Sequence, residues 1–238
     1  MRVVQESKNL FRLTRFGMIN CFLVREADGF TLVDTGLRGS AGAIGQAATR
    51  LGASIRRIVL THAHIDHIGS LDSLMEALPS CEFAIGKRET RLLANDLSLD
   101  AGENGKMLLG FTGAKSYPSR LLVEGDRVCS LQAVASPGHT PGHVAYLDVR
   151  DNSLIAGDAF TTQTGLVVAG VFKPLFPFPA LFSWNAVVSA KSAAKLRDLN
   201  PSLLAVGHGP SISSPTPAMD VALQEAFRQH LVAKENVK

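Results

Sequence analysis

Residues 61–70 read THAHIDHIGS, and this stretch constrains the chain more than any other feature of its sequence. It follows IRRIVL at residues 55–60, an apolar run with the character of a buried strand. Imidazole and carboxylate groups are ligands of zinc and related metals. Four potential ligands directly after a strand favour a metal site over ordinary turn chemistry. These four are His62, His64, Asp66 and His67.

The HxHxDH spacing indicates that one segment serves two metals. In an extended turn, side chains alternate with a period of two, so His62 and His64 point the same way. Asp66 and His67 are offset onto the other side. The segment can therefore supply ligands to two neighbouring metals, whereas a helical HExxH motif serves one.

Further potential ligands stand where other apolar strands end. Asp34 ends FTLVD, His139 ends VASPGH, Asp158 ends LIAGD and His208 ends LLAVGH. In an α/β architecture, the loops after strands gather at one edge of a rigid scaffold, where sites are built. One such residue alone is more often a cap or turn residue. Together with HxHxDH, the set predicts two coordination shells.

This ordered set resembles that of the metallo-β-lactamase-fold hydrolases, because all five motifs of that superfamily are present between residues 34 and 208. The resemblance implies an α/β chain folded as a four-layer αββα sandwich with the site at one edge. We expect residues 1–238 to form a single domain. The resemblance also implies two divalent metal ions, zinc in the first place, with iron, manganese or cobalt as alternatives. The implied ligands are His62, His64 and His139 for one ion, Asp66, His67 and His208 for the other, and Asp158 as a bridge.

Such a site suits hydrolysis. Two cations about 3.5–4 Å apart share a water and lower its pKa towards neutrality. We expect the bridging hydroxide to attack a carbonyl carbon, with Asp66 and Asp158 as catalytic carboxylates and the metal charge stabilising the oxyanion. The chain contains no GxSxG nucleophile motif. Two further residues are expected to support the ligands, namely Asp34, which orients a ligand histidine, and His143.

The substrate is less constrained than the chemistry. The sequence GDA at 157–159 and the compact length are similar to those of N-acyl homoserine lactone lactonases, but those enzymes place a tyrosine where Thr161 stands here. The apolar, proline-stiffened segment 165–184 is expected to be a pocket wall, with core packing or a dimer contact as the alternative. The glycine-rich segment 97–120 is expected to be a second loop beside the pocket. The predicted pocket residues are Tyr117, Phe160, Thr161, Phe172, Phe176, Phe178 and Phe182.

We therefore expect a metal-dependent hydrolase of the lactonase or esterase type, acting on a lactone or carboxylic ester with an apolar acyl part. The alternatives are a thioester hydrolase similar to glyoxalase II, promiscuous β-lactam turnover, a mononuclear iron persulfide dioxygenase, and a non-catalytic binding module. The B1 β-lactamases place a cysteine where Asp158 stands. Only 30 residues of the 238 follow His208, which is short for the helical glutathione-binding domain of glyoxalase II.

The composition fits an enzyme for small molecules. Of the 238 residues, 46% are hydrophobic, enough for a well-buried core. The net charge is +3 and the basic residues are scattered, so we expect no nucleic-acid partner. No segment has the ~18–20 apolar residues of a membrane span, and the first residues lack the apolar part of a signal peptide. We expect a cytoplasmic enzyme, monomeric or homodimeric, with Cys21, Cys81 and Cys129 as small buried residues.

Apolar periodicity predicts helices over 40–51, 70–78, 87–95 and 185–198. The segments LLVEGDRV (121–128) and LQAVASPGH (131–139) are predicted to form paired strands around Gly125-Asp126. A closing amphipathic helix is predicted in the tail, with His230 at its surface. Its apolar stripe comprises Met219, Leu223, Phe227 and Leu231.

Overall fold

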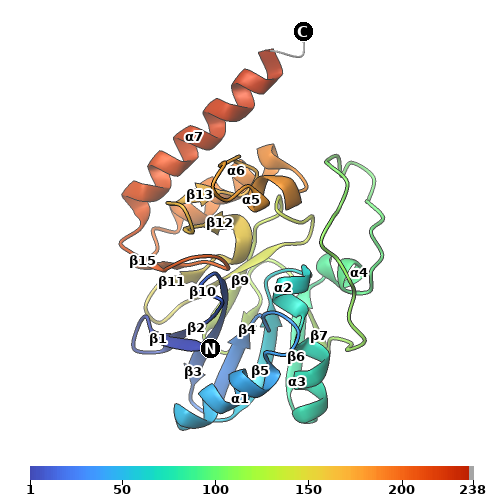
Figure 1. Ribbon diagram of the computed structural model, residues 1–238, viewed down its shortest axis with the longest axis vertical. Coiled ribbons are helices and arrows are strands. Elements are labelled where there is room, and N and C mark those ends of the chain that lie inside the picture. Colours follow the sequence, from blue (N-terminus) through green and yellow to red (C-terminus); the bar gives the residue numbers. More distant parts are fainter. Residues whose placement is uncertain (236–238) are drawn as a thin grey trace. The chain divides into compact units, whose positions relative to one another are not determined.

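The computed structural model describes residues 1–235, which form two compact units (Figure 1). The first unit comprises Met1–Leu97 and Gly110–Val123, and the second comprises Ser98–Leu109 and the chain from Glu124 onward. Each unit has its own sheet and helices. The side chains of His230 and Leu231 lie outside the described part of the chain. The single-domain organisation stays a prediction.

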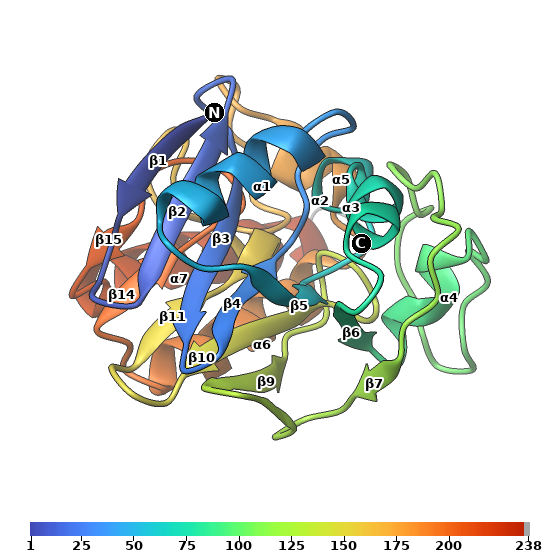
Figure 2. The same cartoon turned by 90° about the horizontal axis from the view of Figure 1, so that it is seen from below.

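The first unit is built on a seven-stranded sheet in the order β1-β2-β3-β4-β5-β6-β7 (Figure 2). The first four strands are antiparallel neighbours, and β4 to β7 pair in parallel. Because the carboxyl ends of parallel strands lie at the same edge, the turns after β4 and β5 are neighbours. The strands are β1 (Arg2–Gln5), β2 (Leu10–Arg15), β3 (Ile19–Glu26), β4 (Gly29–Val33), β5 (Ile55–Leu60), β6 (Glu82–Gly86) and β7 (Arg120–Leu122). The helices are α1 (Ala41–Arg50), α2 (Ile65–Ile68), α3 (Leu71–Ala77) and α4 (Glu89–Leu93).

The second unit contains a six-stranded sheet in the order β15-β14-β11-β10-β9-β8 and a two-stranded sheet, β12-β13. In the larger sheet, β11 and β14 pair in parallel and the other neighbours are antiparallel. The strands are β8 (Arg127–Val128), β9 (Leu131–Ala135), β10 (Val144–Asp148), β11 (Ser153–Ile155), β12 (Phe160–Thr161), β13 (Val167–Val168), β14 (Leu203–Ala205) and β15 (Ile212–Ser213). The helices are η1 (Gly157–Ala159), a 3₁₀ turn, and α5 (Phe178–Phe182), α6 (Ala186–Asp198) and α7 (Thr216–Glu235).

The core of the second unit is filled from its sheet and its two long helices. Leu154 and Leu204 pack from the sheet, Ala193 from α6, and Met219 and Ala226 from α7. The small residues on α6 allow it to pack closely against α7. None of the helices that the structure describes is both long and apolar enough to cross a membrane.

Most predicted helices are confirmed within one or two residues at each end, as α1, α3, α4 and α6. The closing helix is also present, with Met219 and Leu223 buried, but Phe227 is exposed and does not belong to the buried stripe. No helix or strand lies in residues 97–119 of the predicted loop, but its last residue, Arg120, begins β7.

The prediction that 121–128 pairs with 131–139 is right for Arg127 and Val128 but wrong for the residues before Gly125. Gly125 has φ 85° and its N–H donates to Ala133 O, so the chain turns there. The residues before the turn form β7, which pairs with β6 in the first unit, and those after it form β8, which pairs with β9 in the second. A left-handed glycine thus ends one strand and lets the chain enter another sheet.

The three cysteines, all within the described residues, form no disulfide. Cys21 is buried, as expected, and burial raises the pKa of its thiol. Burial also raises the pKa of the half-buried Cys81, to about 11. Cys129 is exposed, so its prediction as a buried residue is wrong. It lies in the turn between β8 and β9, where its backbone is left-handed with φ 52°.

The side chain of Asn185 caps the N-terminus of α6 in the second unit. The side chain of Asn185 accepts hydrogen bonds from the N–H groups of Val187 and Val188, both at 3.1 Å, and donates to Asn104 O at 2.5 Å. We predict that Asn185→Ala lowers the free energy of unfolding by about 1 kcal/mol, because it removes the helix cap. Asn185→Ser also loses the contact with Asn104 but keeps a cap acceptor, so it should lose less than the alanine variant. Denaturant unfolding measures both, and equal losses would contradict a capping role.

Candidate metal centre

A buried carboxylate organises the HxHxDH stretch in the first unit. Asp34 follows β4 with φ 61° and is 1% exposed. Its Oδ1 accepts the N–H of Thr61, and its Oδ2 accepts the Thr61 hydroxyl and His67 Nδ1, all at 2.8 Å. Because the carboxylate accepts, the proton of neutral His67 lies on Nδ1, and Nε2 carries the lone pair that a metal requires.

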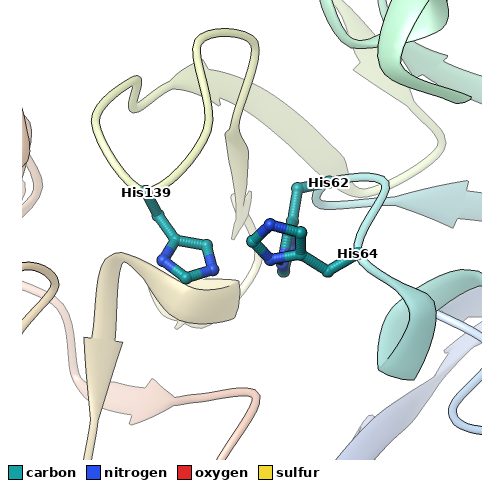
Figure 3. Close-up of side chains that lie close together, drawn as sticks. All are labelled: His62, His64 and His139. Carbon is teal, nitrogen blue, oxygen red and sulfur yellow. Dashed lines mark hydrogen bonds between the residues drawn. The ribbon is translucent and has the colours of Figure 1, made fainter. Parts of the chain in front are cut away.

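The hydroxyl of Thr61 extends this network to a second histidine. Its proton is donated to Asp34, so its oxygen accepts from His62 Nδ1 at 3.0 Å. The lone pair of neutral His62 is therefore on Nε2, which lies 3.0 Å from His64 Nδ1. Two nitrogens at metal-bond length on a tetrahedral zinc ion are about 3.3 Å apart. Figure 3 shows His62 and His64 side by side on the segment after β5, as two ligands of one ion would be.

The stretch changes conformation after His64. His64 is extended, with φ −68° and ψ 150°, but α2 begins at Ile65, so the expected extended turn does not continue to Asp66 and His67. Asp66 and His67 diverge from the first pair through a helical turn, not through strand alternation. Asp66 Oδ2 lies 3.8 Å from His67 Nε2. The stretch thus presents two ligand pairs, each of adjacent donor atoms.

Two residues that the sequence analysis did not single out lie against this stretch. Glu89 Oε1 accepts the N–H of Ala63 at 2.9 Å. The ring of Phe111 lies 4.6 Å from the ring of His64, between centroids. The N–H of Ile65 donates to Gly110 O, which holds this part of the long loop in place. Glu89 lies in a predicted helix, and no sequence pattern near it predicts the contact with Ala63.

In the second unit, one carboxylate oxygen lies between two histidines. Asp158 belongs to η1, directly after β11, and its Oδ2 is 3.5 Å from His139 Nε2 and 3.1 Å from His208 Nε2. His139 comes from the loop between β9 and β10 (Figure 3), and its Nδ1 lies 3.1 Å from Ser183 Oγ. His208 follows β14. A single carboxylate oxygen therefore faces the Nε2 atoms of both imidazoles.

His143 lies behind Asp158. Its Nε2 accepts the backbone N–H of Asp158 at 3.2 Å, and its Nδ1 lies 2.8 Å from Ser136 Oγ. Since Nε2 accepts, Nδ1 carries the proton and donates to the serine. This hydrogen bond turns the Nε2 lone pair towards the peptide of η1, so the ring supports the loop that carries Asp158.

The aromatic residues of segment 165–184 form a series that begins at His208. Phe176 is 7% exposed, and its ring centroid lies 5.7 Å from that of His208. Phe178 lies 5.3 Å from Phe176 and is 52% exposed, and Phe182 lies 6.4 Å from Phe178. Phe172 is also half exposed. Within the second unit, an apolar surface therefore runs outward from a candidate ligand.

The other predicted pocket residues have different surroundings. Phe160 is fully buried in the core of the second unit. Thr161 is buried too, and its hydroxyl donates to His208 O at 3.0 Å, so it holds the backbone of that histidine. Tyr117, in the first unit, is 87% exposed.

The comparisons with known proteins agree with this reading. Residues 14–208 match the metallo-beta-lactamase superfamily. The chain is 42% identical over 231 residues to the uncharacterized protein YobT of Bacillus subtilis (strain 168), covering 95% of this chain and 99% of YobT. It is 33% identical over 132 residues to the hydroxyacylglutathione hydrolase of Rhodospirillum rubrum, covering 52% of this chain and 41% of that enzyme. The crystal structure of TTHA1623 in a di-iron-bound form matches with a TM-score of 0.65 and 25% identity, covering 86% of this chain and 94% of that one.

These matches confirm the predicted fold class. The matched residues include every candidate ligand from His62 to His208 as well as Asp34. The match to YobT covers 99% of that protein, so the resemblance is not confined to the motifs. The chain belongs to the metallo-beta-lactamase superfamily.

Proposed function

We propose that this metallo-hydrolase holds two divalent ions, zinc in the first place, and hydrolyses lactones or carboxylic esters with an apolar acyl part. The observation that carries the proposal is the position of Asp158 Oδ2, at 3.5 and 3.1 Å from the Nε2 atoms of His139 and His208. Metal bridging by one carboxylate explains why a single oxygen faces two imidazoles.

The donor set of each unit suits this assignment. In the first unit, His62 and His64 present converging nitrogens, and Asp66 and His67 form a separate pair. Neutral imidazole and carboxylate are the ligands that zinc and iron accept in hydrolytic and oxygen-dependent sites. We propose that His139 completes the first pair and His208 the second, with Asp158 between the ions. The di-iron form of TTHA1623 supports two metals of a transition type.

Bound divalent ions would supply a water of lowered pKa and polarise the substrate carbonyl. The residues of the chain do the positioning. Asp34 and Thr61 hold His67 and His62 in the tautomers that leave Nε2 for a metal. His143 holds the backbone of η1, and with it Asp158. We propose that the carboxylates of Asp66 and Asp158 orient the attacking water.

The aromatic surface beside His208 supports an apolar substrate. Phe176 contacts the ring of His208, and the half-exposed Phe178 extends the surface away from it. A carbonyl group placed at the ligands would direct an attached alkyl chain along these rings. Burial of each methylene there contributes about 0.8 kcal/mol at most, which favours longer chains.

A thioester hydrolase is the second candidate, because the hydroxyacylglutathione hydrolase of Rhodospirillum rubrum is 33% identical over its matched part. The match leaves more than half of that enzyme uncovered, since it spans 41% of its length. A panel of lactones, esters, thioesters and β-lactams, followed with a pH indicator, separates the two. Preferred turnover of lactones or esters supports our proposal, and preferred turnover of thioesters supports the alternative.

The bridging role of Asp158 predicts the metal content. Purified protein should carry about two transition-metal ions per chain, measured by elemental analysis, as a two-metal site requires. Asp158→Asn should lower metal content and reduce kcat/KM by at least about 100-fold, because both ions lose a charged ligand. The control is Asp148→Asn, because Asp148 is also a buried aspartate, at the end of β10, but is not a candidate ligand. One iron per chain in the wild type would point to the persulfide dioxygenase instead.

The Asp34 network predicts a graded loss of metal affinity. Asp34→Asn replaces the shared acceptor of His67 and Thr61, so it should weaken metal binding by about 10- to 100-fold. Thr61→Val removes the hydroxyl that joins Asp34 to His62 but keeps the contact between Asp34 and His67, so it should cost less. Competition with a chelator measures both affinities. An Asp34→Asn variant with the affinity of the wild type would show that the carboxylate does not orient the ligands.

The aromatic surface predicts selectivity for chain length. Phe178→Ala should raise KM for long-chain lactones more than for short ones, because it removes an exposed apolar contact and leaves the ligands in place. Phe176→Ala should have the same direction, but Phe176 is buried and its removal also lowers stability. Steady-state kinetics over a series of acyl lengths provides the measurement. Equal changes for short and long substrates would assign the segment to core packing or to a dimer contact.

A further inference from the structure

A second buried carboxylate lies against the HxHxDH stretch. Glu89 is 0% exposed, and its Oε1 accepts the N–H of Ala63 at 2.9 Å. Ala63 is the residue between His62 and His64. A carboxylate removed from water is unfavourable unless it is compensated, so a glutamate at this place needs a physical reason.

The fold brings Glu89 to this place from a neighbouring strand. β6 pairs in parallel with β5, so their carboxyl ends lie at the same edge of the sheet. Glu89 begins α4, three residues after β6 ends. Leu92 and Leu93 are buried and anchor the helix in the core. The carboxylate is therefore presented by a rigid element to the turn that follows β5.

The contact acts on the peptide that joins two candidate ligands. His62 Nε2 and His64 Nδ1 lie 3.0 Å apart, and that separation depends on the orientation of the backbone between them. From this geometry we infer that Glu89 is a positioning residue: it holds the Ala63 peptide so that both ring nitrogens face one ion. The inference rests on the proposed function, because it concerns the same centre. Asp34 fixes the ring of His67 directly and that of His62 through Thr61, whereas Glu89 fixes the backbone between His62 and His64.

Three variants separate the hydrogen bond from other effects of the residue. Glu89→Gln keeps an acceptor oxygen at the same reach, Glu89→Asp keeps the charge but withdraws the oxygen, and Glu89→Ala removes both. We expect Glu89→Asp and Glu89→Ala to bind cobalt(II) about 10- to 100-fold more weakly than the wild type. Glu89→Gln should stay close to the wild type. The metal-free proteins are titrated with cobalt, affinity is measured by competition with a chelator, and the absorption spectrum reports the ligand geometry.

Asp148→Ala is the matched control. Asp148 is also a buried carboxylate, in the second unit, and is paired with Arg150 at 2.6 Å. Its removal should lower the stability of the protein but leave cobalt affinity and spectrum unchanged. If Glu89→Ala does not fold, the comparison of Glu89→Asp with Glu89→Gln decides.

The outcomes are distinguishable. Wild-type affinity and spectrum in Glu89→Ala, or in Glu89→Asp if the alanine variant does not fold, would overturn the inference but leave the proposed metal centre intact. A Glu89→Gln variant as weak as Glu89→Asp would also overturn it, because the acceptor alone would then be insufficient. A wild-type chain that binds no cobalt overturns both the inference and the proposed function.

Discussion

The hydrogen bonds of Asp34 are the interaction on which the rest of the candidate site depends. A buried carboxylate is unfavourable by itself, and it is stabilised here by a backbone N–H, a hydroxyl and an imidazole N–H, each at 2.8 Å. Those same three donors belong to the turn that carries the ligands. The same hydrogen bonds therefore compensate the burial of the Asp34 carboxylate and orient the histidines. The left-handed backbone of Asp34 is the conformation that turns the chain at the end of β4.

The second unit uses the same physical device in a different arrangement. There the histidine supports the carboxylate: His143 accepts the N–H of Asp158 and holds the 3₁₀ turn. His208 is held on two sides, by Phe176 at its ring and by Thr161 at its carbonyl. Each unit thus fixes its own ligands through buried polar contacts that are satisfied within the unit. Such preorganisation lowers the cost of ordering the ligands when a metal binds.

The parts that the sequence predicted well are those governed by local patterns. The IRRIVL strand, the helices α1 and α6, and the HxHxDH motif all show in residue type and spacing, and the structure confirms the two helices and the strand. The split of 121–128 between two sheets depends on which strands are available as partners, and a single segment does not contain that information. The helical start at Ile65 was missed because the motif spacing is compatible with either conformation.

Two contacts missed at the site join residues that are far apart in the sequence. Glu89 reaches Ala63 across 26 residues, and Thr61 reaches Asp34 across 27. Nothing in the sequence near Glu89 distinguishes it from a solvated residue at the start of a helix. Parallel strand order creates these contacts, because it places the ends of β4, β5 and β6 at one edge. Residue type and the family resemblance were therefore enough to predict the ligands and the role of Asp34, but the contacts of Thr61 and Glu89 depend on the strand order.

The position of His208 has a consequence for how substrate selection can evolve in such a chain. Its ring touches Phe176, the first residue of the aromatic series, and its backbone is fixed from β12. A substitution of the buried Phe176 alters a ring that contacts the candidate ligand His208. A substitution of the exposed Phe178 does not, because the ring of Phe176 lies between Phe178 and His208. Variation that alters substrate preference at little cost to metal binding should therefore concentrate at the exposed end. Phe176 is constrained by packing and by the ligand at the same time.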